Sequence, residues 1–74
     1  MNGNAALCFY WRSKTWNSEG IKPTHVVIFD MEAKSYKTYS TAVIPQGRNA
    51  MELNTKSDLD KLVDALEHLA FKKV

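Results

Sequence analysis

The sequence has little of what small domains commonly use to stabilise a fold. It contains one cysteine among 74 residues, so an internal disulfide is impossible. Cys8 and the two histidines, His25 and His68, do not have the spacing of a zinc site. No run approaches the ~18 apolar residues of a membrane helix, and no signal-peptide pattern opens the chain. Because a domain of this size has a small core, oligomerisation remains as the expected source of extra stability.

The usual arrangements of catalytic residues are also missing from the sequence. Cys8 lies in an apolar segment with no base implied beside it, and each histidine is interpreted as a surface or partly satisfied residue. The three glycines are isolated, so the chain has no glycine-rich phosphate loop. We therefore expect no enzymatic activity, no cofactor and no metal site.

Charge is distributed unevenly along the chain. Residues 1–51 contain six lysines and arginines against three acids, whereas residues 52–74 contain four lysines against five acids. The formal net charge of +2 therefore arises in the first two-thirds. This distribution favours an anionic partner for that part of the protein.

Strand-like segments fill the basic part of the chain. Aromatic and β-branched runs predict strands, and residues 17–20, 32–35 and 45–47 predict the turns between them. The nearly continuous apolar run THVVIFDM is interpreted as a central strand. We predict an α+β domain over residues 1–74, a four-stranded antiparallel sheet followed by one helix. Its strands are expected at residues 7–16, 24–31, 36–44 and 48–53.

The last third has the periodicity of an amphipathic helix, predicted over residues 57–71. Ser57 is the expected N-cap, with Asp60 three residues later. A stripe of apolar residues spans roughly 120° of arc and is interpreted as core, with an outer edge available to a dimer. Phe71 lies off this stripe and is expected to cover a sheet edge or touch a second subunit. The core and dimer candidates are Leu59, Leu62, Val63, Leu66, Leu69 and Phe71.

The first predicted strand has two different faces. Leu7, Phe9 and Trp11 alternate on one side and, with Met51 and Leu53, are expected to pack against the helix. The other side is basic and aromatic. Single-stranded nucleic acid needs such side chains, because cations neutralise phosphates and flat rings stack on unpaired bases. The alternative interpretation is a solvated strand face. The candidate binding residues are Tyr10, Arg12, Lys14, Trp16, Lys34, Lys37, Tyr39 and Arg48.

The stretch from Gly47 to Asn54, followed by a polar helix start and a leucine-rich helix, resembles the positive-cofactor-four family. This family comprises transcriptional coactivators with bacterial and phage relatives, and is akin to the Whirly proteins. The hairpin from Phe29 into Tyr36 is also similar. The resemblance implies a homodimer in which helices pack together and curved sheets bind single-stranded DNA with little sequence preference. It also implies phosphate contacts for Lys34 and Arg48.

Two departures limit what the resemblance carries over. The first strand does not align with the family residue by residue, and THVVIFD replaces the family's apolar-charged alternation. The DNA contacts expected for Tyr10, Arg12, Lys14 and Trp16 therefore rest on the two-face argument alone.

The functional prediction is a non-enzymatic, homodimeric protein that binds single-stranded DNA, or RNA. It would act in replication or recombination or as a transcription coactivator, with replication or transcription proteins as further partners and no membrane. The short chain fits a phage or bacterial member in the cytoplasm, whereas a eukaryotic member would be nuclear. The alternative is a small protein-interaction module, such as a phage-encoded inhibitor of a host protein, presenting a sheet edge or the Trp11 and Trp16 region.

Overall fold

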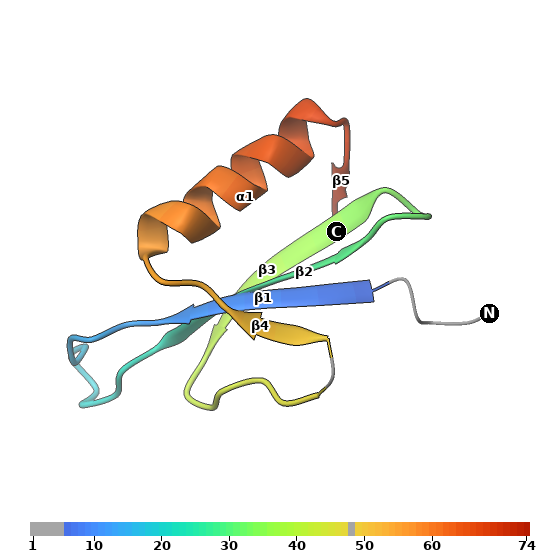
Figure 1. Cartoon of the computed structure of the whole chain (residues 1–74). Helices are drawn as coiled ribbons and strands as arrows, with labels where there is room; N and C mark the ends of the chain where they lie inside the picture. The colour runs from blue at the N-terminus through green and yellow to red at the C-terminus, as the bar shows by residue number, and fades with distance from the viewer. Residues whose placement is uncertain (1–5, 48) are drawn as a thin grey trace.

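A five-stranded sheet with one helix across a single face makes up the protein (Figure 1). The computed structural model describes residues 6–47 and 49–74. Its elements, in chain order, are β1 (Ala6–Arg12), β2 (Thr24–Asp30), β3 (Ser35–Thr41), β4 (Ala50–Glu52), α1 (Lys56–His68) and β5 (Lys72–Lys73). The predicted α+β class with a single C-terminal helix is confirmed.

The sheet is mixed, so the prediction of four antiparallel strands is wrong. The strand order is β4-β1-β2-β3-β5. β1 and β3 run antiparallel to β2, while β4 pairs parallel with β1 and β5 pairs parallel with β3. Alternation of polar and apolar residues specifies the faces of a strand but not its neighbours. The pairing partner of a three-residue strand was therefore not visible in the sequence.

Because β4 lies at the far edge of the sheet from β3, the segment that connects them must cross the sheet, and we call it the crossover. β3 and β4 point the same way, and β1 and β2 lie between them, so the connection after Thr41 passes over both strands. Pro45, Gln46 and Gly47 line an open cavity of about 450 Å³ together with Cys8 and Ile28. The crossover therefore lies against the sheet face opposite the helix. The face that the sequence predicts to be basic and aromatic is therefore partly covered.

Several predicted boundaries extend too far. The first strand ends at Arg12 and not at Trp16, because the Ser13 hydroxyl binds the C=O of Thr15 and the chain turns. The third strand ends at Thr41 rather than at residue 44. The second ends at Asp30, whose carboxylate accepts the N–H groups of Glu32 and Ala33 in the hairpin turn. Local side-chain to backbone bonds of this kind compete with strand pairing.

The helix begins one residue earlier and ends three residues earlier than predicted. Thr55, not Ser57, is the N-cap, and its hydroxyl accepts the N–H of Asp58 at 3.0 Å. At the other end Ala70 adopts a φ of 67°, in the left-handed region that stops a helix. The N–H of Phe71 then donates to the C=O of Leu66 at 2.9 Å. This reversal directs the chain back to the sheet as β5.

The reversal also explains the position of Phe71. It is only 7 % exposed, and its ring meets Phe29 edge to face with centroids 6.2 Å apart. Phe71 is therefore a residue of the chain's own core, and its contact with a sheet edge or a second subunit stays a prediction. A helical wheel misplaced it because it lies beyond the last helical residue.

The core lies between α1 and the middle of the sheet. Leu59 and Leu66 are buried, and Leu62 and Val63 pack partly buried against the same cluster. Leu69 differs, since 57 % of it is exposed. The predicted apolar stripe of the helix thus packs into the chain's own core, except at the C-terminal end of the stripe. On the sheet side the contributors are Leu7, Phe9, Val27, Phe29, Tyr36 and Leu53, whereas Met51 is exposed.

Tyr36 joins the sheet to the helix through a polar contact. Its side chain is 3 % exposed, and its O–H donates to Glu67 Oε2 at 3.0 Å. Burial raises the pKa of the phenol above its ordinary 10.0, and the bond to the Glu67 carboxylate and its negative charge raise this pKa further. The folded state therefore holds the phenolic proton more tightly than the unfolded state.

This contact predicts a loss of stability at alkaline pH. A group whose pKa is raised on folding stabilises the folded state fully at pH values below its pKa in the unfolded state. This contribution disappears as the pH rises through its pKa in the folded state. We expect the unfolding free energy to decline above about pH 10. The Tyr36→Phe variant should lose this part of the decline. Urea unfolding of both proteins across the alkaline range is the measurement, and identical pH profiles would contradict the prediction.

Within the described residues, no helix combines the length and apolar character needed to cross a membrane.

Candidate functional site

Strand register assigns each side chain of β1, β2 and β3 to one of two faces. Phe9 pairs with Val27, and both pack against the helix-side core. Side chains alternate along a strand, so the residues directly before and after Phe9 and Val27 face away from α1. On this opposite face Tyr10 lies across from Val26, and Val26 lies across from Tyr39. The two-face prediction for the first strand is confirmed from Leu7 to Arg12.

The centre of this face is a row of two tyrosines with a valine between them. Val26 is 1 % exposed, while 42 % of Tyr39 is exposed and Tyr10 is half-buried. Neighbouring strands lie about 4.8 Å apart, which places the two tyrosine backbones about 10 Å from each other. The row is held by the central strand β2, which pairs with both tyrosine strands.

Two cations flank the tyrosine row. Arg12 is exposed at the end of β1, two residue pairs beyond Val26, and is paired with Thr24. Lys37 lies on the other side, with Nζ 5.9 Å from the centroid of the Tyr39 ring. One acid, Glu52 on β4, lies in register beside Tyr10. We call Tyr10, Arg12, Lys37 and Tyr39 the tyrosine face.

Lys14 and Trp16 do not belong to this face, because both lie in the loop between β1 and β2. Trp16 is 68 % exposed, and Lys22 Nζ lies 4.8 Å from its ring centroid. The loop has a defined turn, since the Asn17 carboxamide oxygen accepts the N–H groups of Glu19 and Ile21. Lys22 was missed from the sequence. The loop leaves the sheet at the Arg12 end and so extends the cationic and aromatic surface beyond it.

Lys34 lies at the opposite end of the sheet from this loop. It is in the hairpin between β2 and β3, exposed, with a φ of 52°. Its C=O accepts the N–H of Lys72 on β5 at 2.8 Å, so the backbones of two lysines meet there. Lys72 was not a candidate from the sequence, because it directly follows the helix predicted over residues 57–71. The prediction for Arg48 falls on a residue outside those described.

The crossover covers part of the tyrosine face. Its residues form, with Tyr39 and Cys8, the cavity of about 450 Å³. Burial raises the pKa of the Cys8 thiol, which disfavours the reactive thiolate. The cavity leaves Tyr39 accessible from one side. A flat ligand would therefore approach between the crossover and β3.

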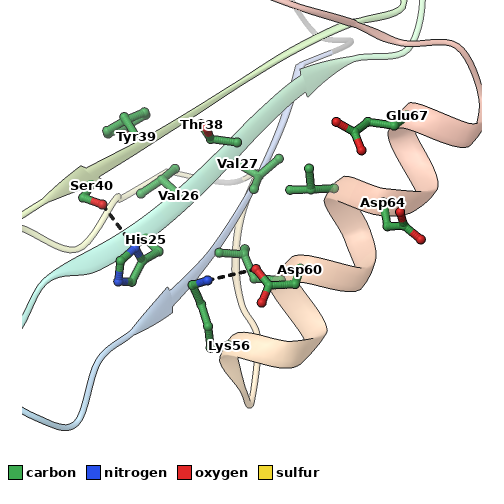
Figure 2. Close-up of a pocket in the computed structure, with 12 residues that line it drawn as sticks. His25, Val26, Val27, Thr38, Tyr39, Ser40, Lys56, Asp60, Asp64 and Glu67 are labelled. Carbon is green, nitrogen blue, oxygen red and sulfur yellow. Dashed lines mark hydrogen bonds and ion pairs between the residues drawn. The ribbon is translucent and has the colours of Figure 1, made fainter.

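The helix side of the molecule has a different character. An open groove of about 380 Å³ runs between α1 and the outer part of β3 (Figure 2). Asp60, Asp64 and Glu67 lie along its helix wall, and Lys56 Nζ is 2.9 Å from Asp60 Oδ1. The helix face is therefore acidic, while the tyrosine face carries two cations with one acid, Glu52, beside it. An anion would be drawn to the tyrosine face and repelled from the helix.

One serine and one histidine meet in this groove, which the sequence did not suggest. Ser40 Oγ lies 3.1 Å from His25 Nδ1, and the histidine ring stacks on Trp11 with centroids 5.7 Å apart. In residues 6–47 and 49–74 no carboxylate hydrogen-bonds His25, so the orienting acid of a catalytic triad is missing there. We interpret the pair as a cross-strand contact between β2 and β3.

Across the same described ranges, no three His, Cys, Asp or Glu side chains gather in a way that could hold a metal ion.

Comparison with models of known protein families gave no match, and neither the curated proteins nor the solved structures include one that matches this chain.

Proposed function

We propose that this protein binds single-stranded DNA, or RNA, as a non-enzymatic protein with little sequence preference. One observation carries the proposal. Two tyrosines flank Val26 on the face opposite an acidic helix, and Arg12 and Lys37 stand on either side of them. Stacking surfaces beside cations are what a single strand requires.

The proposed binding mode assigns separate tasks to the two kinds of side chain. The guanidinium of Arg12 and the ammonium of Lys37 neutralise phosphates, and the rings of Tyr10 and Tyr39 stack on unpaired bases. Bases in a duplex are already stacked on each other, so this face favours single strands. Stacking tolerates any base, which accounts for the low sequence preference. Trp16 and Lys22 would extend the contact past the end of β1.

Titration of labelled single-stranded and double-stranded oligonucleotides, followed by fluorescence anisotropy at several salt concentrations, tests the proposal. We expect binding to the single strand that weakens with salt, with a log-log slope of about −0.7 for each phosphate contacted. The Arg12→Ala/Lys37→Ala variant should lose affinity and have a slope less steep by about 1.4.

Lys61→Ala is the control for losing a positive charge elsewhere, because Lys61 is exposed on the helix, away from the tyrosine face. It should retain the wild-type slope. No binding at low salt, or equal affinity for duplex and single strand, would overturn the proposed function.

The homodimer is part of this proposal, as are a cytoplasmic setting and a role in replication, recombination or transcription. Leu59, Leu66 and Phe71 are buried in the chain's own core, so a second copy would contact other surfaces. Leu69 at the helix end is exposed and lies next to the buried stripe. Sedimentation of the free protein measures this state directly.

A second candidate function is supported by exposed apolar side chains outside the tyrosine face. Trp16 and Val43 are each 68 % exposed, and Ile44 is also exposed. Exposed aromatic and aliphatic residues on loops commonly contact protein partners. A protein partner recovered in fixed ratio after nuclease treatment, and lost in a Trp16→Ala variant, would favour this function.

A further inference from the structure

The outer edge of β3 is paired over only part of its length. β5 pairs with Ser35 and Tyr36, and the N–H of Val74 donates to the C=O of Tyr36 at 2.7 Å. The backbone groups of a strand point alternately to its two sides, so the N–H and C=O groups of Thr38 and Ser40 point outward like those of Tyr36. Among residues 6–47 and 49–74, none pairs with this stretch of the edge.

This unpaired edge forms one wall of the acidic groove. Thr38, Tyr39 and Ser40 line the groove from β3, and α1 lines it from the other side (Figure 2). β5 follows the same edge beside the C-terminal end of the helix (Figure 1). β5 thus already pairs with Ser35 and Tyr36 of β3. The groove lies beside the next residues of the same strand, Thr38 to Ser40. An extended chain segment would find both a free edge and room to lie on it.

The charged groups that face the groove define what kind of segment it would accept. Lys56 is paired with Asp60, and Glu67 accepts the Tyr36 hydroxyl, while Asp64 is 3.9 Å from the imidazole of His68. The groove lining carries three acids and one lysine, together with His25. Side chains on the helix side of an added strand would therefore be favoured when they are cationic. Those on the other side would lie near the Tyr39 ring.

We propose that this edge binds an extended peptide of alternating basic and apolar residues as an additional β-strand beside Thr38 and Ser40. Main-chain hydrogen bonds would hold the peptide, and the acidic wall would select its cationic side chains. The proposal rests on a different part of the molecule from nucleic-acid binding, because the acidic wall lies on the helix side of the sheet and the two share only Tyr39.

A second copy of this chain suits the edge less well. Antiparallel pairing of two β3 edges about a two-fold axis normal to the sheet would place both helices on the same side. The acidic walls, with Asp60, Asp64 and Glu67, would then face each other and repel. Charge complementarity therefore favours a basic peptide over a copy of the protein.

Isotope-labelled protein and a short peptide alternating valine and lysine provide the test, read out by amide hydrogen exchange and chemical shifts. We expect slower exchange of the Thr38 and Ser40 amides on binding, and an affinity that falls with salt. Asp60→Asn/Asp64→Asn should weaken binding by about 2- to 30-fold, the effect of losing two exposed ion pairs. Glu19→Gln/Glu32→Gln is the matched control, because both acids are exposed outside the groove, and it should bind like wild type.

Three results would overturn the proposal. A valine–glutamate peptide that binds equally well would exclude selection by the acidic wall. A lysine peptide with alternate backbone nitrogens methylated, if it binds equally well, would exclude strand addition. Protection of Thr38 and Ser40 in the free protein at concentrations where sedimentation detects a dimer would show that a second copy covers the edge. Single-stranded DNA titration of the same Asp60→Asn/Asp64→Asn variant should be unchanged, which separates the two proposals.

Discussion

Replacing Phe29 by alanine is expected to remove a large part of the stability of this protein. Phe29 is 6 % exposed, stacks on Phe9 with centroids 5.8 Å apart, and meets Phe71 edge to face. Loss of a buried phenylalanine costs about 3–5 kcal/mol. A chain of this length has a total unfolding free energy of about 4–11 kcal/mol. The Phe29→Ala variant should therefore unfold at a much lower urea concentration than the wild type, which urea unfolding followed by circular dichroism will show.

Leu69→Ala is the control for this experiment. Leu69 lies at the end of the helix stripe but is 57 % exposed, so its truncation should change stability by less than about 0.5 kcal/mol. If both variants lost the same amount, the structural distinction between the two positions would be incorrect. A loss for Leu69→Ala that varies with protein concentration would instead place this residue in a dimer contact.

The second large effect is expected on nucleic-acid binding. Stacking of one base on an aromatic side chain is worth about 1–3 kcal/mol by alanine substitution. Tyr10→Ala/Tyr39→Ala removes both rings of the tyrosine face, so affinity for a single strand should fall between about 30-fold and 10 000-fold. Fluorescence anisotropy at one fixed salt concentration measures the loss.

Ring-preserving variants separate stacking from other effects of these substitutions. Tyr10→Phe/Tyr39→Phe keeps both flat surfaces and should bind within a few-fold of wild type. Both variants should be checked by circular dichroism, because Val26 between the tyrosines is buried and its surroundings change. Wild-type affinity in the folded alanine variant would remove the tyrosine row from the site.

The sequence predicted on which face of the sheet the side chains of β1 lie, but it did not predict which short strands pair with which. Alternation placed Leu7 and Phe9 on the core side and Tyr10 and Arg12 on the other, because the side-chain period of a strand is two residues. The 3.6-residue period likewise identified the helix and its buried leucines. These features depend on residues close together in the chain, which is why they could be predicted.

The features that failed depend on distant parts of the chain. Ala50 pairs with Cys8, and Lys72 pairs with Ser35. Nothing in a three-residue or two-residue segment specifies such a partner, and each pairing depends on how the whole chain closes. The crossover over the tyrosine face follows from the first of these pairings. The groove beside β3 follows from the pairing of Lys72 with Ser35, because β5 does not extend as far as Thr38.

The helix is attached to the sheet at both of its ends. β4 precedes it and pairs at the β1 edge, while β5 follows it and pairs at the β3 edge (Figure 1). α1 is therefore a diagonal strap fixed to opposite borders of the sheet. Its contacts close long stretches of chain, whereas β1, β2 and β3 join through short connections. Folding should accordingly begin with β1, β2 and β3 and finish with the docking of α1. Neither edge strand, β4 or β5, can separate from the sheet without loosening the helix between them.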